Sequence, residues 1–129
     1  MPTISEDPDE MITVSFRFRR GDSMMECEKN LQTALNEAGS MATGKCLEHF
    51  DRDGSPLVMG GEKWTSKGLF SREYQTPYGE TKIQRHLYQT ARGGRTFCPL
   101  EATARVVRSA TPLFARQVGH KFGIMFGNI

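Results

Sequence analysis

Cysteine, tryptophan and long apolar segments are scarce in this chain of 129 residues. Its three cysteines, Cys27, Cys46 and Cys98, are odd in number and widely spaced, which argues against a disulfide framework and fits a reducing compartment. No apolar run approaches the roughly 18 residues that a membrane-spanning helix needs, and the acidic start is neither a secretory signal nor a transit peptide. These absences predict a cytoplasmic protein with no membrane partner.

Charge is plentiful, and it is divided unevenly along the chain. Residues 1–62 contain 6 Lys/Arg and 12 Asp/Glu, a net charge of −6, whereas residues 63–129 contain 11 and 3, a net charge of +8. A positive charge of this size suits the phosphate backbone of a nucleic acid. The alternative is that the acidic half folds against the basic half and cancels its field.

The patterns predict a disordered acidic tail over residues 1–10 and a single α+β domain over 11–129. The domain divides into an acidic subregion, 11–62, and a basic hairpin with a helix pair, 63–129. The Gly60-Gly61 pair marks the expected joint between them.

The acidic subregion begins with alternating apolar and polar residues over 11–19, which predict a half-buried strand. A helix is expected over about 23–38, capped by Asp22 or Ser23 and ended by Gly39. A second helix is expected from Ser40 to about residue 50.

The basic subregion is predicted to form a hairpin of strands 69–76 and 80–88 around Pro77-Tyr78-Gly79. An arginine, Arg72 or Arg85, lies in the middle of each apolar strand face. Each of these arginines either pairs with a buried acid or reaches toward a partner. Helix starts at Pro99 and at Thr111-Pro112 complete the predicted helix pair.

Sharper site patterns are weak in this sequence. An EF-hand alignment over 51–62 places Pro56 where the calcium loop needs glycine. Cys46 and His49 have zinc-ligand spacing but no second close pair. Cys98 at a helix start could have a lowered pKa, but no catalytic base is identifiable. We therefore assign no catalytic residue, metal ligand or cofactor to this chain.

A family resemblance is carried by the strings DRDGSPLVMGGEKWTSKG, REYQTPYGETKIQRHLYQ, GGRTFCPLE and TPLFARQV. In this order they resemble the N-terminal part of bacterial insertion-sequence transposases, most closely the Kra-type elements of cyanobacteria. The resemblance covers about residues 12–129. It implies a DNA-binding and assembly region upstream of an RNase H-like catalytic domain, in which three carboxylates bind two divalent metals.

The chain is expected to be truncated before that catalytic domain, so metal is expected only for a full-length form. The predicted function is therefore binding of DNA at transposon ends, or assembly, during transposition. The alternative is a non-catalytic remnant that acts as a folded or oligomerising interaction protein, for which a stripe of Phe114, Val118 and Phe122 is the candidate contact surface. The residues predicted to contact DNA are Arg72, Lys82, Arg85, His86, Tyr88, Arg92 and Arg95, followed by Arg105 and Arg108.

Overall fold

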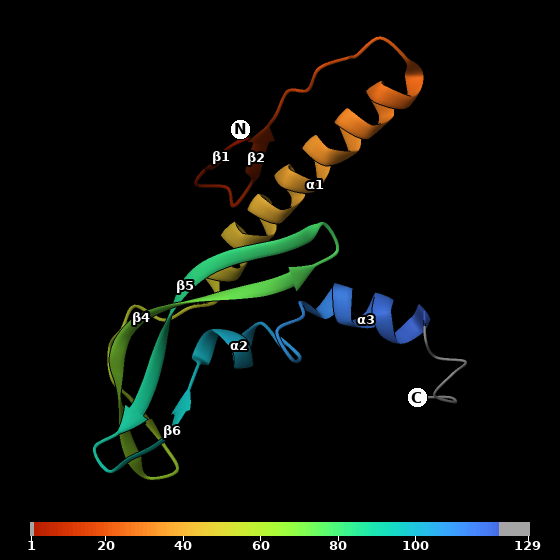
Figure 1. The fold of residues 1–129 in the computed structure, drawn as a ribbon. Coiled ribbons are helices and arrows are strands. Elements are labelled where there is room, and N and C mark those ends of the chain that lie inside the picture. Colours follow the sequence, from red (N-terminus) through yellow and green to blue (C-terminus); the bar gives the residue numbers. More distant parts are fainter. Residues whose placement is uncertain (1, 122–129) are drawn as a thin grey trace.

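The computed structural model describes residues 2–121 and has an α+β fold. A long helix, α1 (Met24–His49), lies beside a small hairpin of β1 (Thr3–Glu6) and β2 (Ile12–Ser15) (Figure 1). An antiparallel sheet follows, with its strands in the order β3 (Leu57–Met59), β4 (Glu62–Thr76), β5 (Gly79–Thr90) and β6 (Gly93–Phe97). Two helices, α2 (Pro99–Thr103) and α3 (Pro112–Lys121), complete the described chain.

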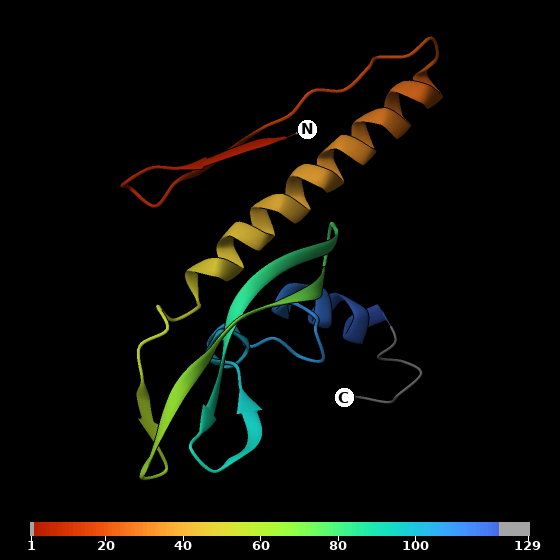
Figure 2. The ribbon, with the colours of Figure 1, turned by 60° about the vertical axis from the view of Figure 1, so that its left-hand side comes forward.

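The core lies where α1, α2 and the β4–β5 hairpin meet. Leu47 of α1, Tyr74 of β4, Ile83 of β5 and Leu100 of α2 form one buried cluster. Only the C-terminal half of α1 takes part in it. The N-terminal half extends past the sheet, with the β1–β2 hairpin and the segment after it alongside (Figures 1 and 2).

Helix α1 begins as predicted, because the Ser23 hydroxyl accepts a hydrogen bond from the Glu26 N–H at 3.1 Å. It does not end at Gly39, so one helix replaces the two that were predicted. The ring of Tyr78 lies over Gly39, and a Cβ built there would come within 2.3 Å of its Cγ. Gly39 is therefore a contact point for the hairpin within a continuous helix, and it is not a helix end.

The predicted disordered tail differs from the structure, since residues 3–6 form strand β1. Its register with β2 runs from Thr3 opposite Ser15 to Glu6 opposite Ile12. The connecting turn is closed by Asp7, whose Oδ1 accepts the N–H groups of Asp9 and Met11. The strand predicted over 11–19 ends at Ser15, which lies opposite Thr3, the first residue of its short partner β1.

The central hairpin is confirmed and is longer than predicted. Thr76 pairs with Gly79, so Pro77 and Tyr78 alone form the turn. Gly60 and Gly61 are not a joint between subregions. They form the turn between β3 and β4, with φ of 60° and 78°, values that favour glycine.

The C-terminal helix pair is also confirmed, with Pro99 and Pro112 as the first residues of α2 and α3. Helix α2 is short. After it, the Gln75 N–H donates a hydrogen bond to the Ser109 carbonyl at 2.7 Å, and the Gln75 carbonyl accepts one from the Thr111 N–H at 3.0 Å. This main-chain pairing holds the start of α3 against β4.

In the stripe proposed for oligomerisation, Phe114 is half-buried, Val118 is exposed, and Phe122 lies outside the described residues. No helix within 2–121 is long and apolar enough to cross a membrane.

Candidate nucleic-acid interface

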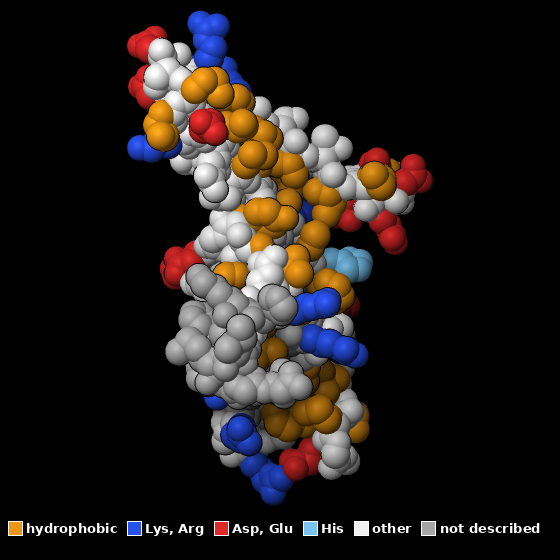
Figure 3. All heavy atoms as spheres, turned by 90° about the vertical axis from the view of Figure 1, so that its right-hand side faces the viewer, with side chains coloured by type: hydrophobic (Ala, Val, Ile, Leu, Met, Phe, Trp, Pro, Cys, Tyr) orange, Lys and Arg blue, Asp and Glu red, His pale blue; other side chains and the backbone are white. Residues whose placement is uncertain are grey.

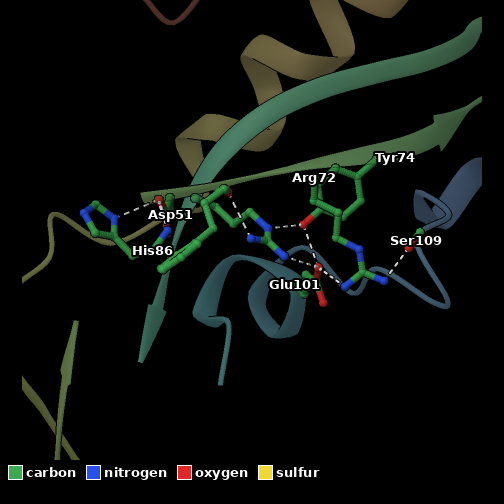
Figure 4. A network of polar contacts seen from close by, with 8 residues as sticks. Asp51, Arg72, Tyr74, His86, Glu101 and Ser109 are labelled. Carbon is green, nitrogen blue, oxygen red and sulfur yellow. Dashed lines mark hydrogen bonds and ion pairs between the residues drawn. The ribbon is translucent and has the colours of Figure 1, made fainter. Parts of the chain in front are cut away.

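Two of the predicted DNA contacts, Arg72 and Arg85, converge on one half-buried carboxylate (Figure 4). Oε2 of Glu101, on α2, accepts hydrogen bonds from Arg72 Nη1 at 3.0 Å and from the Tyr74 hydroxyl at 2.6 Å. Arg85 lies 3.6 Å from the same oxygen and donates to Tyr74 and to the Phe70 carbonyl. Of the two alternatives for these arginines, pairing with an acid is the one found, although Glu101 is only half-buried. The Arg85 side chain is 6% exposed, whereas the Arg72 side chain is 43% exposed and remains open to solvent.

The surroundings of this network change the pKa of two of its members. Burial raises the pKa of the Tyr74 hydroxyl, and the hydrogen bond to Glu101 raises it further. For Arg85, burial alone lowers the pKa, but the hydrogen bond to Tyr74 and the nearby charges outweigh it and the pKa is raised. Arg85 is only 5% exposed, so its charge serves the fold and is too buried to contact DNA.

His86 and Tyr88 are held by the loop that follows α1. The Asp51 Oδ2 accepts the His86 N–H and lies 3.0 Å from its Nδ1 (Figure 4). The Tyr88 hydroxyl donates to the Ser55 carbonyl at 2.7 Å, and the residue is completely buried. The predicted contact of Tyr88 with DNA is therefore not possible in this fold, because the loop that contains Ser55 covers this residue.

The other five predicted contacts, Lys82, Arg92, Arg95, Arg105 and Arg108, are exposed. Lys82 is the least suitable of them. It lies opposite Glu73 in the register of the β4–β5 hairpin, and it borders a groove that also contains Glu48, Asp51 and Asp53. An anionic backbone would be repelled by that acidic surround.

Arg92 and Arg95 lie at the end of the sheet formed by the β3–β4 and β5–β6 turns, and Lys63 on β4 is exposed at the same end. We call these three residues the sheet-tip cluster. In Figure 3, Lys and Arg side chains are visible at this lower end of the molecule. Glu62 pairs with Arg92, whose side chain is nevertheless 79% exposed. Sequence reasoning missed Lys63, although its position two residues after the Gly60-Gly61 turn could have indicated it.

Arg105 and Arg108 occupy left-handed backbone positions, with φ of 57° and 49°. Arg105 follows the last turn of α2, where the Val106 N–H bonds to the Glu101 carbonyl and where glycine is the usual residue. Arg108 lies in the turn closed by Val107 and Ala110. An exposed arginine at each of these positions is less favourable for the backbone than glycine would be.

Few direct ion pairs join the two halves of the chain. Among residues 2–121, the ion pairs that join an acid of the first half to a base of the second are Glu62–Arg92 and Asp51–His86. The pairs made by Arg72 and Arg85 lie within the basic half, and both use Glu101. Direct contact with the acidic half therefore neutralises few of the exposed cations of the second half.

The weaker site patterns also have structural outcomes. No group of three metal-ligating side chains is found in the part of the chain that the structure describes. Burial raises the pKa of the Cys98 thiol, the opposite of what an activated nucleophile needs. Asp53 of the EF-hand alignment accepts the Ser55 N–H at 2.9 Å and closes a local turn.

Comparison of the chain with protein-family models, with curated proteins and with solved structures gives no match in any of the three.

Proposed function

We propose that this chain is the DNA-binding and assembly portion of an insertion-sequence transposase, and that it acts in the cytoplasm. The observation that carries the proposal is the segregated charge. The basic half has a net charge of +8 and shares only two ion pairs with the acidic half within residues 2–121. The hairpin and Gly-Gly motifs resemble those of transposases. From this resemblance we infer that the ligand of the basic half is the DNA duplex at the transposon ends.

The DNA-facing residues in this proposal are the sheet-tip cluster, Lys63, Arg92 and Arg95, together with Arg105 and Arg108. Each would neutralise a phosphate and so fix the position of the protein on the duplex. The backbone strain supports the inclusion of Arg105 and Arg108, because exposed arginines at left-handed positions have no evident benefit for folding. Arg92 would exchange Glu62 for a phosphate on binding.

The test is a titration of labelled duplex DNA at several salt concentrations with variants of opposite expected sign. Arg95→Ala and Arg105→Gly should each lower the slope of log K against log salt by about 0.9, the value for one phosphate contact. Glu62→Gln should raise the affinity by releasing Arg92. Lys29→Ala, which removes an exposed lysine from α1, should change nothing.

Arg105→Gly is informative because glycine suits the left-handed position, so the variant should fold at least as stably as the parent. Loss of affinity in a protein of unchanged stability would separate DNA contact from folding. If the parent chain does not bind duplex DNA at low salt, or if the arginine variants keep its slope, the DNA-binding proposal is wrong. The interaction-protein alternative would then be favoured.

A further inference from the structure

The outer edge of β4 is open along the middle of the strand. Strand β5 pairs with β4 on one side, and on the other side β3 reaches no further than Trp64 (Figure 2). At the far end of β4, the segment Ser109–Thr111 pairs with Gln75. Between these two partners, residues 67–73 are all exposed. Within residues 2–121, the longest strand of the sheet therefore has an edge of several residues with no strand beside it.

The backbone groups on this open edge belong to alternate residues. Gln75 bonds through its N–H and C=O to the segment before α3, so these groups point away from β5. The loop after α1 accepts the His86 N–H, so His86 and its cross-strand partner Leu69 do not bond each other. Counting by twos from both ends places the N–H and C=O groups of Leu69, Ser71 and Glu73 on the open edge. No other main-chain group within residues 2–121 bonds them.

We propose that this edge binds an extended peptide segment of a partner protein, which adds to the sheet as a further strand. An exposed strand edge is a template for such pairing, because its N–H and C=O groups supply the affinity. The segment should be about five residues long, since the open edge runs from Leu69 to Glu73. A bulge between Ser66 and Leu69 interrupts the ladder at one end, and Gln75 already has its partner at the other.

The chain itself already uses this mode of binding at the end of the same edge. The segment around Ala110 comes from outside the sheet and adds to β4 beside Gln75, through main-chain hydrogen bonds alone. A peptide on Leu69–Glu73 would continue this added strand along the edge.

A second copy of the chain fits the open edge less well than a short peptide does. In a two-fold antiparallel pairing centred on Ser71, Gln75 of each copy would lie opposite Lys67 of the other. The place beside Gln75 is taken by Ala110, so the two copies would overlap there. A short segment whose ends turn away from the sheet avoids this overlap.

The exposed side chains of the edge indicate what the peptide should carry. Phe70 is 45% exposed and the Arg72 side chain is 43% exposed, and both lie on the face of β4 that carries Tyr74. Arg72 donates to Glu101 and Ser109, which leaves guanidinium N–H groups for another carboxylate. In the antiparallel direction, which is the slightly more stable one, we therefore expect an acidic residue opposite Arg72 and an apolar residue opposite Phe70.

The test is a titration of the isotope-labelled full chain with the peptide acetyl-Thr-Glu-Thr-Val-Thr-amide, followed through the amide NMR signals. The signals of Leu69, Ser71 and Glu73 should shift, and their exchange with solvent should slow, because these N–H groups gain acceptors. Lysine in place of the peptide glutamate should weaken binding by roughly two- to fivefold, the effect of one exposed ion pair.

Two methylated peptides separate main-chain pairing from side-chain contact. In the proposed register the threonine N–H groups face β4, so a peptide N-methylated at its three threonines should not bind. A peptide N-methylated at glutamate and valine should still bind, because those N–H groups point away from β4.

A matched pair of protein variants tests the same edge from the other side. Ser71→Pro should keep the fold, since proline is tolerated where a strand N–H faces solvent, and it should lose the peptide. Ser71→Ala keeps the N–H and should bind as the parent does. If Ser71→Pro does not fold, the two methylated peptides decide the question alone.

Four results would overturn the proposal. They are absence of shifts at Leu69, Ser71 and Glu73 with millimolar peptide, equal binding of the threonine-methylated peptide, and binding by a folded Ser71→Pro variant. The fourth is a parent that sediments as a dimer and becomes a monomer on Ser71→Pro, because the edge would then bind a second copy.

Discussion

Replacement of Glu101 by glutamine should destabilise the protein far more than loss of a surface charge does. Its Oε2 accepts hydrogen bonds from Tyr74 at 2.6 Å and Arg72 at 3.0 Å, and lies 3.6 Å from Arg85. Removal of one partner of a buried ion pair costs about 3–5 kcal/mol. The Arg85 side chain is 6% exposed but that of Glu101 is 24% exposed, so partial solvation should reduce the loss to about 2–3 kcal/mol.

Urea unfolding followed by the fluorescence of Trp64 measures this loss, because Trp64 is the single tryptophan of the chain. With a slope of about 1–3 kcal/mol per molar urea, Glu101→Gln should lower the midpoint by roughly 1–2 M. Glu73→Gln is the control. Glu73 is an exposed acid on β4 that lies opposite Lys82 of β5, so it should contribute at most about 1 kcal/mol.

A double variant identifies Arg85 as the cause of the loss. If the cost of Glu101→Gln comes from an uncompensated buried cation, Arg85→Met should cost much less in the Glu101→Gln protein than in the parent. The reasoning would be refuted if the two changes were simply additive, or if Glu101→Gln and Glu73→Gln lowered the midpoint equally.

Two further predictions concern the same hairpin. Gly39→Ala should destabilise the protein by about 1–2 kcal/mol, because the new methyl group overlaps the Tyr78 ring. In a Tyr78→Ala background the same change should stabilise the protein by up to about 1 kcal/mol, because alanine has the higher helix propensity. Denaturant midpoints that show no such change of sign would contradict this prediction. The raised pKa of Tyr74 favours its protonated form in the fold, so the contribution of Tyr74 to stability should be constant below about pH 10, where unfolded tyrosine begins to ionise, and should fall above it. Tyr74→Phe should flatten that alkaline decline, and Tyr78→Phe should not.

Local signals were sufficient for much of the fold. Three helices begin where the sequence predicted, at the cap Ser23 and at the first-turn prolines Pro99 and Pro112. These signals could be found because caps and first-turn prolines act within a few residues. The hairpin turn was identified from Pro77 and Gly79 and from the alternation on both sides. Strand β1 was missed because its few apolar residues become favourable only through pairing with β2.

The candidate interface could be predicted only in part. The alternation pattern correctly placed Arg72 and Arg85 on apolar faces, but nothing local shows that Glu101 lies between them. Tyr88 was predicted to contact DNA because nothing near it in the sequence shows that the loop containing Ser55 covers it. Exposed cations such as Arg95 were identified from composition alone. The helix break predicted at Gly39 failed because the ring that lies over this glycine comes from the distant hairpin turn.

The main-chain pairing of Gln75 with Ser109 and Thr111 has a consequence for how α3 can vary. The two hydrogen bonds join backbone groups, so the position of the helix start does not depend on which side chains α3 carries. Substitutions on the exposed surface of α3 should therefore leave its attachment to the sheet unchanged. The helix surface can vary in sequence without loss of fold.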